Sequence, residues 1–283
     1  VPFFNWYAPG FAAYSFVQAG QQEYEADRLA AETVGAGALP SALVRLNLKG
    51  EDLERSYWPS IFKAADDQPT PNAAPFRGLM SAERRGFLPE AAKQLRQALE
   101  RKTSTADTHP SLRDRLAALR RPAAIPGEIA GSAAEALLGA QLGEPAAQFD
   151  REWSGAVGDW WRNRHEHVKN GRAKLGALAG KPREQQSDVE LYEYALLVEE
   201  FEDRKKAFEI YKALVLERGA KQGAKYAYAR LLLEQDGNAA IALLEEIMRD
   251  WPEATLPACD LIVGYLLKHG RQKEVQPYVD RYY

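Results

Sequence analysis

The last third of the chain repeats a pair of helical segments, and this repeat limits the possible folds more than any other feature. Three similar turn phrases, at 197–203, 232–237 and 266–270, recur about 33–34 residues apart. Apolar residues at helical spacing flank each phrase. The expected helices are 188–201, 204–218, 224–234, 238–249, 256–268 and 272–282. One such pair cannot bury its apolar face alone, so we expect stacked pairs that share a continuous core.

Small residues mark the places where paired helices are expected to approach closely. Ala195, Ala229 and Gly264 occupy equivalent positions in the three pairs. The period resembles that of tetratricopeptide repeats. The match to that pattern is partial, because the large aromatic residue and the closing proline of the consensus are mostly missing.

The rest of the chain also predicts helices rather than strands. Few segments alternate apolar and polar residues, and Ala, Leu, Glu and Arg recur at helical spacing, which indicates an all-α chain. The expected helices are 11–34, 41–49, 51–65, 89–102, 111–119 and a long charged helix at 144–178. Prolines make 66–75 an extended loop and 120–127 a boundary. The expected parts are 1–120, a linker with the long helix at 121–186, and the repeats at 187–283.

Charge and cysteine content exclude several classes of protein. The net charge of −3 gives no electrostatic basis for nucleic-acid binding. Cys259 is the single cysteine, so an internal disulfide is impossible, and we expect it to be a small buried residue. No stretch approaches the ~18–20 apolar residues of a membrane helix. Residues 1–20 lack the pattern of a signal peptide. Because Val1 is not methionine, we expect the chain to begin inside a longer gene product.

Glu23 and Asp27 form the most suggestive pair of polar residues. They are four residues apart and therefore share one face of the first expected helix. The other members of their stripe are apolar or small: Phe16, Gly20, Ala30 and Val34. Carboxylates that face a core are costly without a compensating cation, and a metal ion would compensate them. A solvated acidic helix face is the alternative interpretation of this spacing, with Arg28 pairing locally with Glu25 or Tyr24.

Two segments resemble the HtpX/CaaX-prenyl-endopeptidase family of zinc metallopeptidases. Residues 23–28 (Glu-Tyr-Glu-Ala-Asp-Arg) resemble that family's Glu-x-x-x-Asp segment. Residues 108–115 (Thr-His-Pro-Ser-Leu-Arg-Asp-Arg) are similar to its Thr-His-Pro-x-x-x-x-Arg segment. The resemblance covers about residues 1–120. It implies the C-terminal helical half of a gluzincin metallopeptidase domain, followed by the long helix and a repeat region like the tails of some bacterial members.

The resemblance implies roles for three side chains. Glu23 would be the third zinc ligand, after two histidines of a His-Glu-x-x-His helix. Asp27 would orient a ligand histidine by accepting its free ring N–H. His109 would lie beside the zinc, near its open coordination position or a developing oxyanion. The structural alternative for the 108–110 segment is a helix-entry loop, with Thr108 or His109 satisfying free N–H groups.

The His-Glu-x-x-His motif is absent from the sequence. Its nearest imitation is His165-Glu166-His167-Val168-Lys169, which has a lysine where the second ligand must be. Its two histidines are two residues apart and point to different faces of a helix. We therefore expect this segment to be a solvated charged helix. We also expect the chain alone to be inactive and to bind zinc weakly or not at all, because zinc sites normally need three or four protein ligands.

The sequence thus predicts part of a bacterial zinc metalloendopeptidase. Its expected partners are protein or peptide substrates, a protein bound to the repeats, and the missing N-terminal part of the same protein. The expected location is a membrane-associated parent at the bacterial inner membrane, with this part soluble and cytoplasmic. A non-catalytic helical-repeat adaptor or an α-solenoid chaperone is the alternative, in which Glu23 and Asp27 would be relics.

Overall fold

The structure is a computed structural model that describes residues 2–35, 37–82, 87, 89–104, 107, 109–129, 131–219 and 221–282. These residues form helices and connecting loops and contain no strand, so the all-α prediction is confirmed. The chain divides into two compact units, Val1–His165 (unit 1) and Glu166–Tyr283 (unit 2). The described residues contain no helix long and apolar enough to cross a membrane. The domain boundaries expected near 120 and 186 stay predictions.

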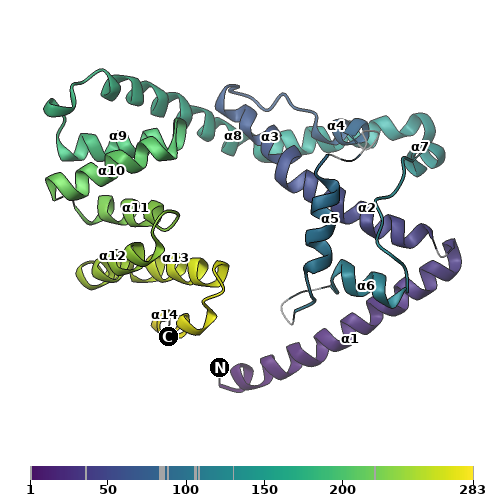
Figure 1. Cartoon of the computed structure of the whole chain (residues 1–283). Helices are drawn as coiled ribbons and strands as arrows, with labels where there is room; N and C mark the ends of the chain where they lie inside the picture. Colours follow the sequence, from purple (N-terminus) through teal and green to yellow (C-terminus); the bar gives the residue numbers. More distant parts are fainter. Residues whose placement is uncertain are drawn as a thin grey trace. The chain divides into compact units, whose positions relative to one another are not determined.

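Unit 1 begins with a long helix, α1, followed by a second continuous helical run (Figure 1). Its elements are α1 (Pro2–Val34), α2 (Ala38–Asp52), η1 (Leu53–Tyr57), α3 (Trp58–Lys63), η2 (Ala64–Asp66), α4 (Pro75–Ala82), α5 (Ala91–Glu100), α6 (Leu112–Ala118), α7 (Ala133–Leu138), η3 (Gly139–Leu142) and the first part of α8 (Gly143–Ala179). Gly35 ends α1 with a φ of 95°, a conformation that glycine adopts without strain. The two helices expected at 41–49 and 51–65 are one run, widened to a π-turn at η1 just before Pro59.

A small apolar core joins α2, α5 and α6. Its buried members are Leu43, Val44, Leu48, Ala91, Leu95, Leu112 and Leu116. The α1 helix contacts α2 and α6. This packing brings the first expected site segment, on α1, next to the second, at the start of α6.

Unit 1 has a second packed region, where aromatic side chains of α3 and α4 meet α8. Trp161 is fully buried, and its Nε1–H donates to the carbonyl of Gln68 at 2.8 Å. Asp150 on α8 is also buried; it accepts the backbone N–H of Phe76 at 2.8 Å and the Arg77 Nε–H at 2.7 Å. The α4 helix was not expected from the sequence, because this distant carboxylate satisfies a free N–H group of its first turn.

Unit 2 is a series of antiparallel helices in which each helix contacts the next (Figure 1). Its elements after α8 are η4 (Arg183–Gln185), α9 (Asp188–Phe201), α10 (Arg204–Arg218), α11 (Gln222–Leu232), α12 (Gly237–Asp250), η5 (Pro252–Ala254), α13 (Thr255–Lys268), η6 (Gln272–Glu274), α14 (Gln276–Val279) and η7 (Asp280–Tyr282). The helix expected at 272–282 is therefore wrong as a single helix, and three short helical segments replace it. The other five expected repeat helices are present within two residues of their expected ends.

The burial of the three small residues in the repeats shows whether helices approach closely at each of them. Ala195 and Ala229 are fully buried, as expected for close helix approach. Gly264 is exposed, and a Cβ atom there would meet nothing within 4 Å, so the expectation for Gly264 is wrong. Cys259 is a free, fully buried cysteine, as expected.

Candidate active-site segment

Glu23 and Asp27 lie on the face of α1 that α6 covers. Asp27 is buried, with 3% of its surface exposed, whereas the Glu23 side chain is 29% exposed. A solvated acidic face therefore does not describe Asp27. Arg28 lies on another face of α1 and pairs with Glu25 and Glu32 at 2.6 Å each, which confirms its expected local pairing with Glu25.

Arg115 of α6 is the cation that compensates Asp27. Its Nε–H donates to Asp27 Oδ2 at 2.8 Å and its Nη2–H to Asp27 Oδ1 at 2.6 Å, so the contact is bidentate. The same Nη2 lies 3.5 Å from Glu23 Oε2. Hydrogen bonding to Asp27 raises the pKa of Arg115, against the opposing effect of burial. Two parallel hydrogen bonds between a planar guanidinium and a carboxylate fix the relative orientation of the two side chains and also balance their charges.

Arg115 was not among the expected site residues, although the sequence contains a signal for it. The apolar stripe around Asp27 requires a cation, and Arg115 is the last residue of the second motif. The metal ion expected to compensate the pair is not needed for Asp27, because a guanidinium already does so. The role of Asp27 toward a ligand histidine stays a prediction, since each of its oxygens keeps a second lone pair.

His109 contacts Glu23 directly. Its Nδ1 lies 2.8 Å from Glu23 Oε1. An ionised carboxylate can only accept, so Nδ1–H donates and Nε2 of the neutral ring keeps a lone pair. The His109 side chain is 66% exposed, and Nε2 is therefore open to a ligand or to a proton.

A small hydrogen-bonded loop places His109 and starts α6. Asp114 accepts from both the hydroxyl (2.6 Å) and the backbone N–H (3.2 Å) of Thr103, and these bonds lower the pKa of Asp114. The Thr103 hydroxyl oxygen in turn accepts the Ser111 N–H at 2.8 Å. Ser111 caps α6 by accepting the Asp114 N–H, so the capping role expected of His109 is wrong and Pro110 precedes the helix. Thr108 lies outside the described residues.

Tyr24 borders this arrangement on α1. Burial raises the pKa of its hydroxyl, and the nearby carboxylate of Asp114 adds to that effect. The Arg115 guanidinium opposes this shift in the pKa of Tyr24, and Asp27 adds to it.

The donor set is incomplete for a catalytic zinc ion. Glu23 offers a carboxylate oxygen and His109 an imidazole nitrogen, whereas catalytic zinc takes three protein ligands and a water. Within the described part of the chain, no group of three or more His, Cys, Asp or Glu side chains is placed to hold a metal ion. The residues present therefore do not fit a complete zinc site.

The other histidine segment is separate from these residues. His165 Nδ1 lies 3.1 Å from the carbonyl of Ala65, and His167 Nε2 lies 3.0 Å from the Glu200 carboxylate. As expected, the two rings point to different neighbours. His167 is exposed and His165 is half-buried.

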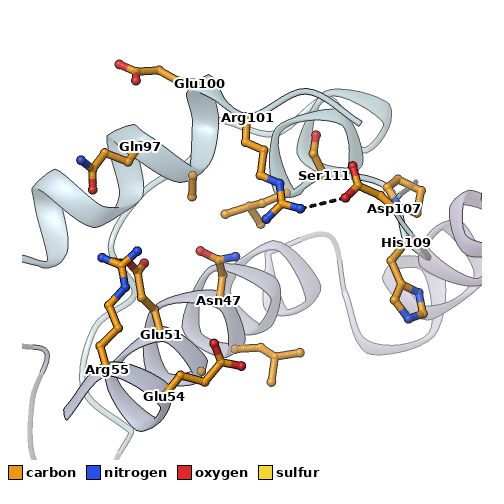
Figure 2. A pocket seen from close by; sticks show the side chains of 15 residues that line it. Asn47, Glu51, Glu54, Arg55, Gln97, Glu100, Arg101, Asp107, His109 and Ser111 are labelled. Atoms are coloured by element: carbon orange, nitrogen blue, oxygen red, sulfur yellow. Dashed lines mark hydrogen bonds and ion pairs between the residues drawn. The ribbon is translucent and has the colours of Figure 1, made fainter. Parts of the chain in front are cut away.

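A polar groove opens beside His109 (Figure 2). Its volume is about 880 Å³. The walls come from α2 with η1, from the last turns of α5, and from the loop that carries His109. No sequence pattern indicated this groove, because it depends on how helices distant in the chain pack together.

Residues 11–123 match the family model of Peptidase family M48. The match contains Glu23, Asp27, His109 and Arg115, and it lies entirely within unit 1. Searches of the curated proteins and of the solved structures found no match to the chain. The class that these findings support for the segment is a metallopeptidase.

Proposed function

We propose that this Peptidase family M48 segment contributes the third-ligand carboxylate of a zinc metalloendopeptidase of the HtpX/CaaX-prenyl-endopeptidase type, and that Glu23 is that carboxylate. The contact between Glu23 and His109 carries the proposal, because two motifs 86 residues apart meet there with their polar atoms 2.8 Å apart. Peptide-bond hydrolysis is the corresponding reaction.

In this proposal, Asp27 and Arg115 position the other two residues. The bidentate pair joins α1 to α6 and keeps the Arg115 guanidinium 3.5 Å from Glu23 Oε2. The other oxygen of Glu23, Oε1, lies 2.8 Å from His109 Nδ1. In its protonated form, the exposed His109 ring can also donate a hydrogen bond from Nε2 to negative charge developing on a substrate carbonyl oxygen.

The proposed site needs two further donors from a His-Glu-x-x-His helix, which these 283 residues do not contain. Glu23 would hold the metal together with those two donors, and the metal would supply water activation and carbonyl polarisation. The chain alone is therefore expected to hold no stoichiometric zinc and to cleave no casein. The parent's place at a bacterial inner membrane is part of the same proposal and rests on the family resemblance.

The experiment is the Glu23→Gln substitution in the full-length gene product. We expect loss of bound zinc, measured by elemental analysis, and a fall of about 10²-fold or more in casein cleavage. The control is Glu32→Gln, an exposed glutamate further along the same helix. Retained zinc and unchanged cleavage in the Glu23→Gln protein would refute the role of Glu23.

A second candidate function is a non-catalytic adaptor or chaperone. The stacked helix pairs of unit 2 favour it, because repeats of this kind offer an extended surface to protein partners. We propose this surface, with its tetratricopeptide-like period, as the binding site for substrate proteins or partners in either case. Capture of client proteins by the full-length protein with protection from proteolysis, rather than cleavage, would favour the adaptor over the enzyme.

A further inference from the structure

The groove beside His109 has the shape and the polar groups to bind a peptide chain. Asn47, Gly50 and Glu54 line one wall and Gln97 and Arg101 the other, with His109 at one end (Figure 2). Its volume of about 880 Å³ lies in the range of sites that enclose several residues or a drug-sized molecule. A substrate that occupies it would therefore extend from the vicinity of Glu23 along α2 and α5.

The charges of the groove do not balance. Arg55 pairs with Glu51 at 2.7 Å, and Arg101 pairs with Asp107 at 2.8 Å. Both guanidinium groups that line the groove are thus neutralised locally. Glu54 lines the groove from the same helical run as Asn47 and has no ion pair or hydrogen bond to any described residue. Glu100 stands at the rim and points away from the groove (Figure 2), so Glu54 is the uncompensated charge that an occupant would meet.

The groove also presents two unused primary amides. Within the described part of the chain, the side chains of Asn47 and Gln97 make no hydrogen bond, and they come from opposite walls. A primary amide offers two donor hydrogens and one acceptor oxygen. Each can therefore pair with both the N–H and the C=O of an extended backbone, irrespective of the sequence of that chain.

We propose that this groove binds an extended segment of a peptide substrate and selects a lysine or arginine side chain through Glu54. Asn47 and Gln97 hold the backbone, and Glu54 faces the basic side chain. This inference rests on the proposed peptidase function and specifies its substrate class. It concerns binding by residues present in this chain, so it can be tested without cleavage.

The test is fluorescence anisotropy with the 283-residue chain. The probes are fluorescein-labelled peptides of alanine and serine with one central lysine, or with norleucine or glutamate in its place. We expect the order lysine, norleucine, glutamate in affinity. Glu54→Gln should weaken lysine-peptide binding by about two- to fivefold, as for a partly exposed ion pair, and leave norleucine-peptide binding unchanged. Asn47→Ala should weaken all three peptides to a similar degree.

The matched control is Glu217→Gln, which removes the same charge from an exposed position on α10 in unit 2. Equal affinity for the three peptides, no measurable binding, or an equal effect of Glu54→Gln and Glu217→Gln would each overturn the proposal. Circular dichroism of every variant verifies that the helices are intact. A failure here would leave the zinc-binding test of Glu23 unaffected, because that test measures metal content and cleavage of casein by the full-length protein.

Discussion

Replacing Arg115 by methionine is expected to destabilise unit 1 by about 3 kcal/mol. The substitution removes two hydrogen bonds to an ionised group, at 2.8 and 2.6 Å, and bonds of that kind contribute about 1.5–3 kcal/mol each. It leaves a carboxylate without a cation on a side chain that is 4% exposed, and breaking a buried pair in this way costs about 3–5 kcal/mol. Arg115 itself is 21% exposed, so solvent reduces the cost toward the lower bound.

Urea unfolding followed by tryptophan fluorescence measures this effect, because Trp251 is the only tryptophan of unit 2 and the others report on unit 1. A loss of about 3 kcal/mol also corresponds to a fall in Tm of roughly 6–12 °C for a unit of this size. Arg113→Met on the same helix is the control; its 3.4 Å pair with Asp114 is exposed and should contribute under about 1 kcal/mol.

A double variant separates charge burial from packing. Asp27→Leu combined with Arg115→Met removes both members of the pair, and similar replacements of buried ion pairs by apolar residues are neutral or stabilising. We expect the double variant to recover at least about 1 kcal/mol relative to Arg115→Met. If Arg115→Met costs no more than Arg113→Met, or if the second substitution brings no recovery, the pair does not compensate a buried charge and the reasoning is wrong.

Two further predictions concern unit 2. Glu190 accepts hydrogen bonds from Lys181 and Ser187, which lower its pKa from 4.5 to about 2, so its stabilising contribution is complete above pH 4.5 and is lost as the pH falls toward 2. In urea unfolding followed by circular dichroism, the difference in unfolding free energy between wild type and Glu190→Gln should therefore shrink from pH 4.5 to pH 2. A difference that stays constant over this interval would contradict the prediction. At Gly171, an added Cβ atom would lie 2.5 Å from the Phe201 ring. Gly171→Ala should therefore destabilise unit 2 by about 1–3 kcal/mol, although alanine has the better helix propensity. Adding Phe201→Leu should recover part of that loss.

Local signals explain why the repeat helices could be predicted well. The ends of α9 and α10 agree with the sequence prediction, and each has a cap within a few residues. Ser187 and Glu190 form a capping box at the start of α9, Asp203 caps α10, and Gly219 ends α10 with a φ of 62°. Because these caps are made by neighbours in sequence, the chain itself contains the information.

The features that could not be predicted from the sequence are contacts between residues far apart in the chain. Arg115 meets Asp27 across 88 residues, and no local pattern on α6 indicates which carboxylate it binds. The polar groove requires the packed positions of α2 and α5. The prediction for Gly264 was wrong because it relied on the repeat period alone. That period placed Gly264 between paired helices, whereas it is exposed on the surface of α13. In the site, the sequence indicated Glu23, Asp27 and His109, and packing added Arg115.

The buried carboxylate of Asp150 has a consequence for the order in which the protein is made. It satisfies the backbone N–H of Phe76, which lies 74 residues earlier in the chain. A ribosome that adds about 5–20 residues per second needs several seconds to reach Asp150 after Phe76. During that interval the first turn of α4 lacks this partner, and the packing of Phe76 on Phe149 can form only after α8 has been synthesised.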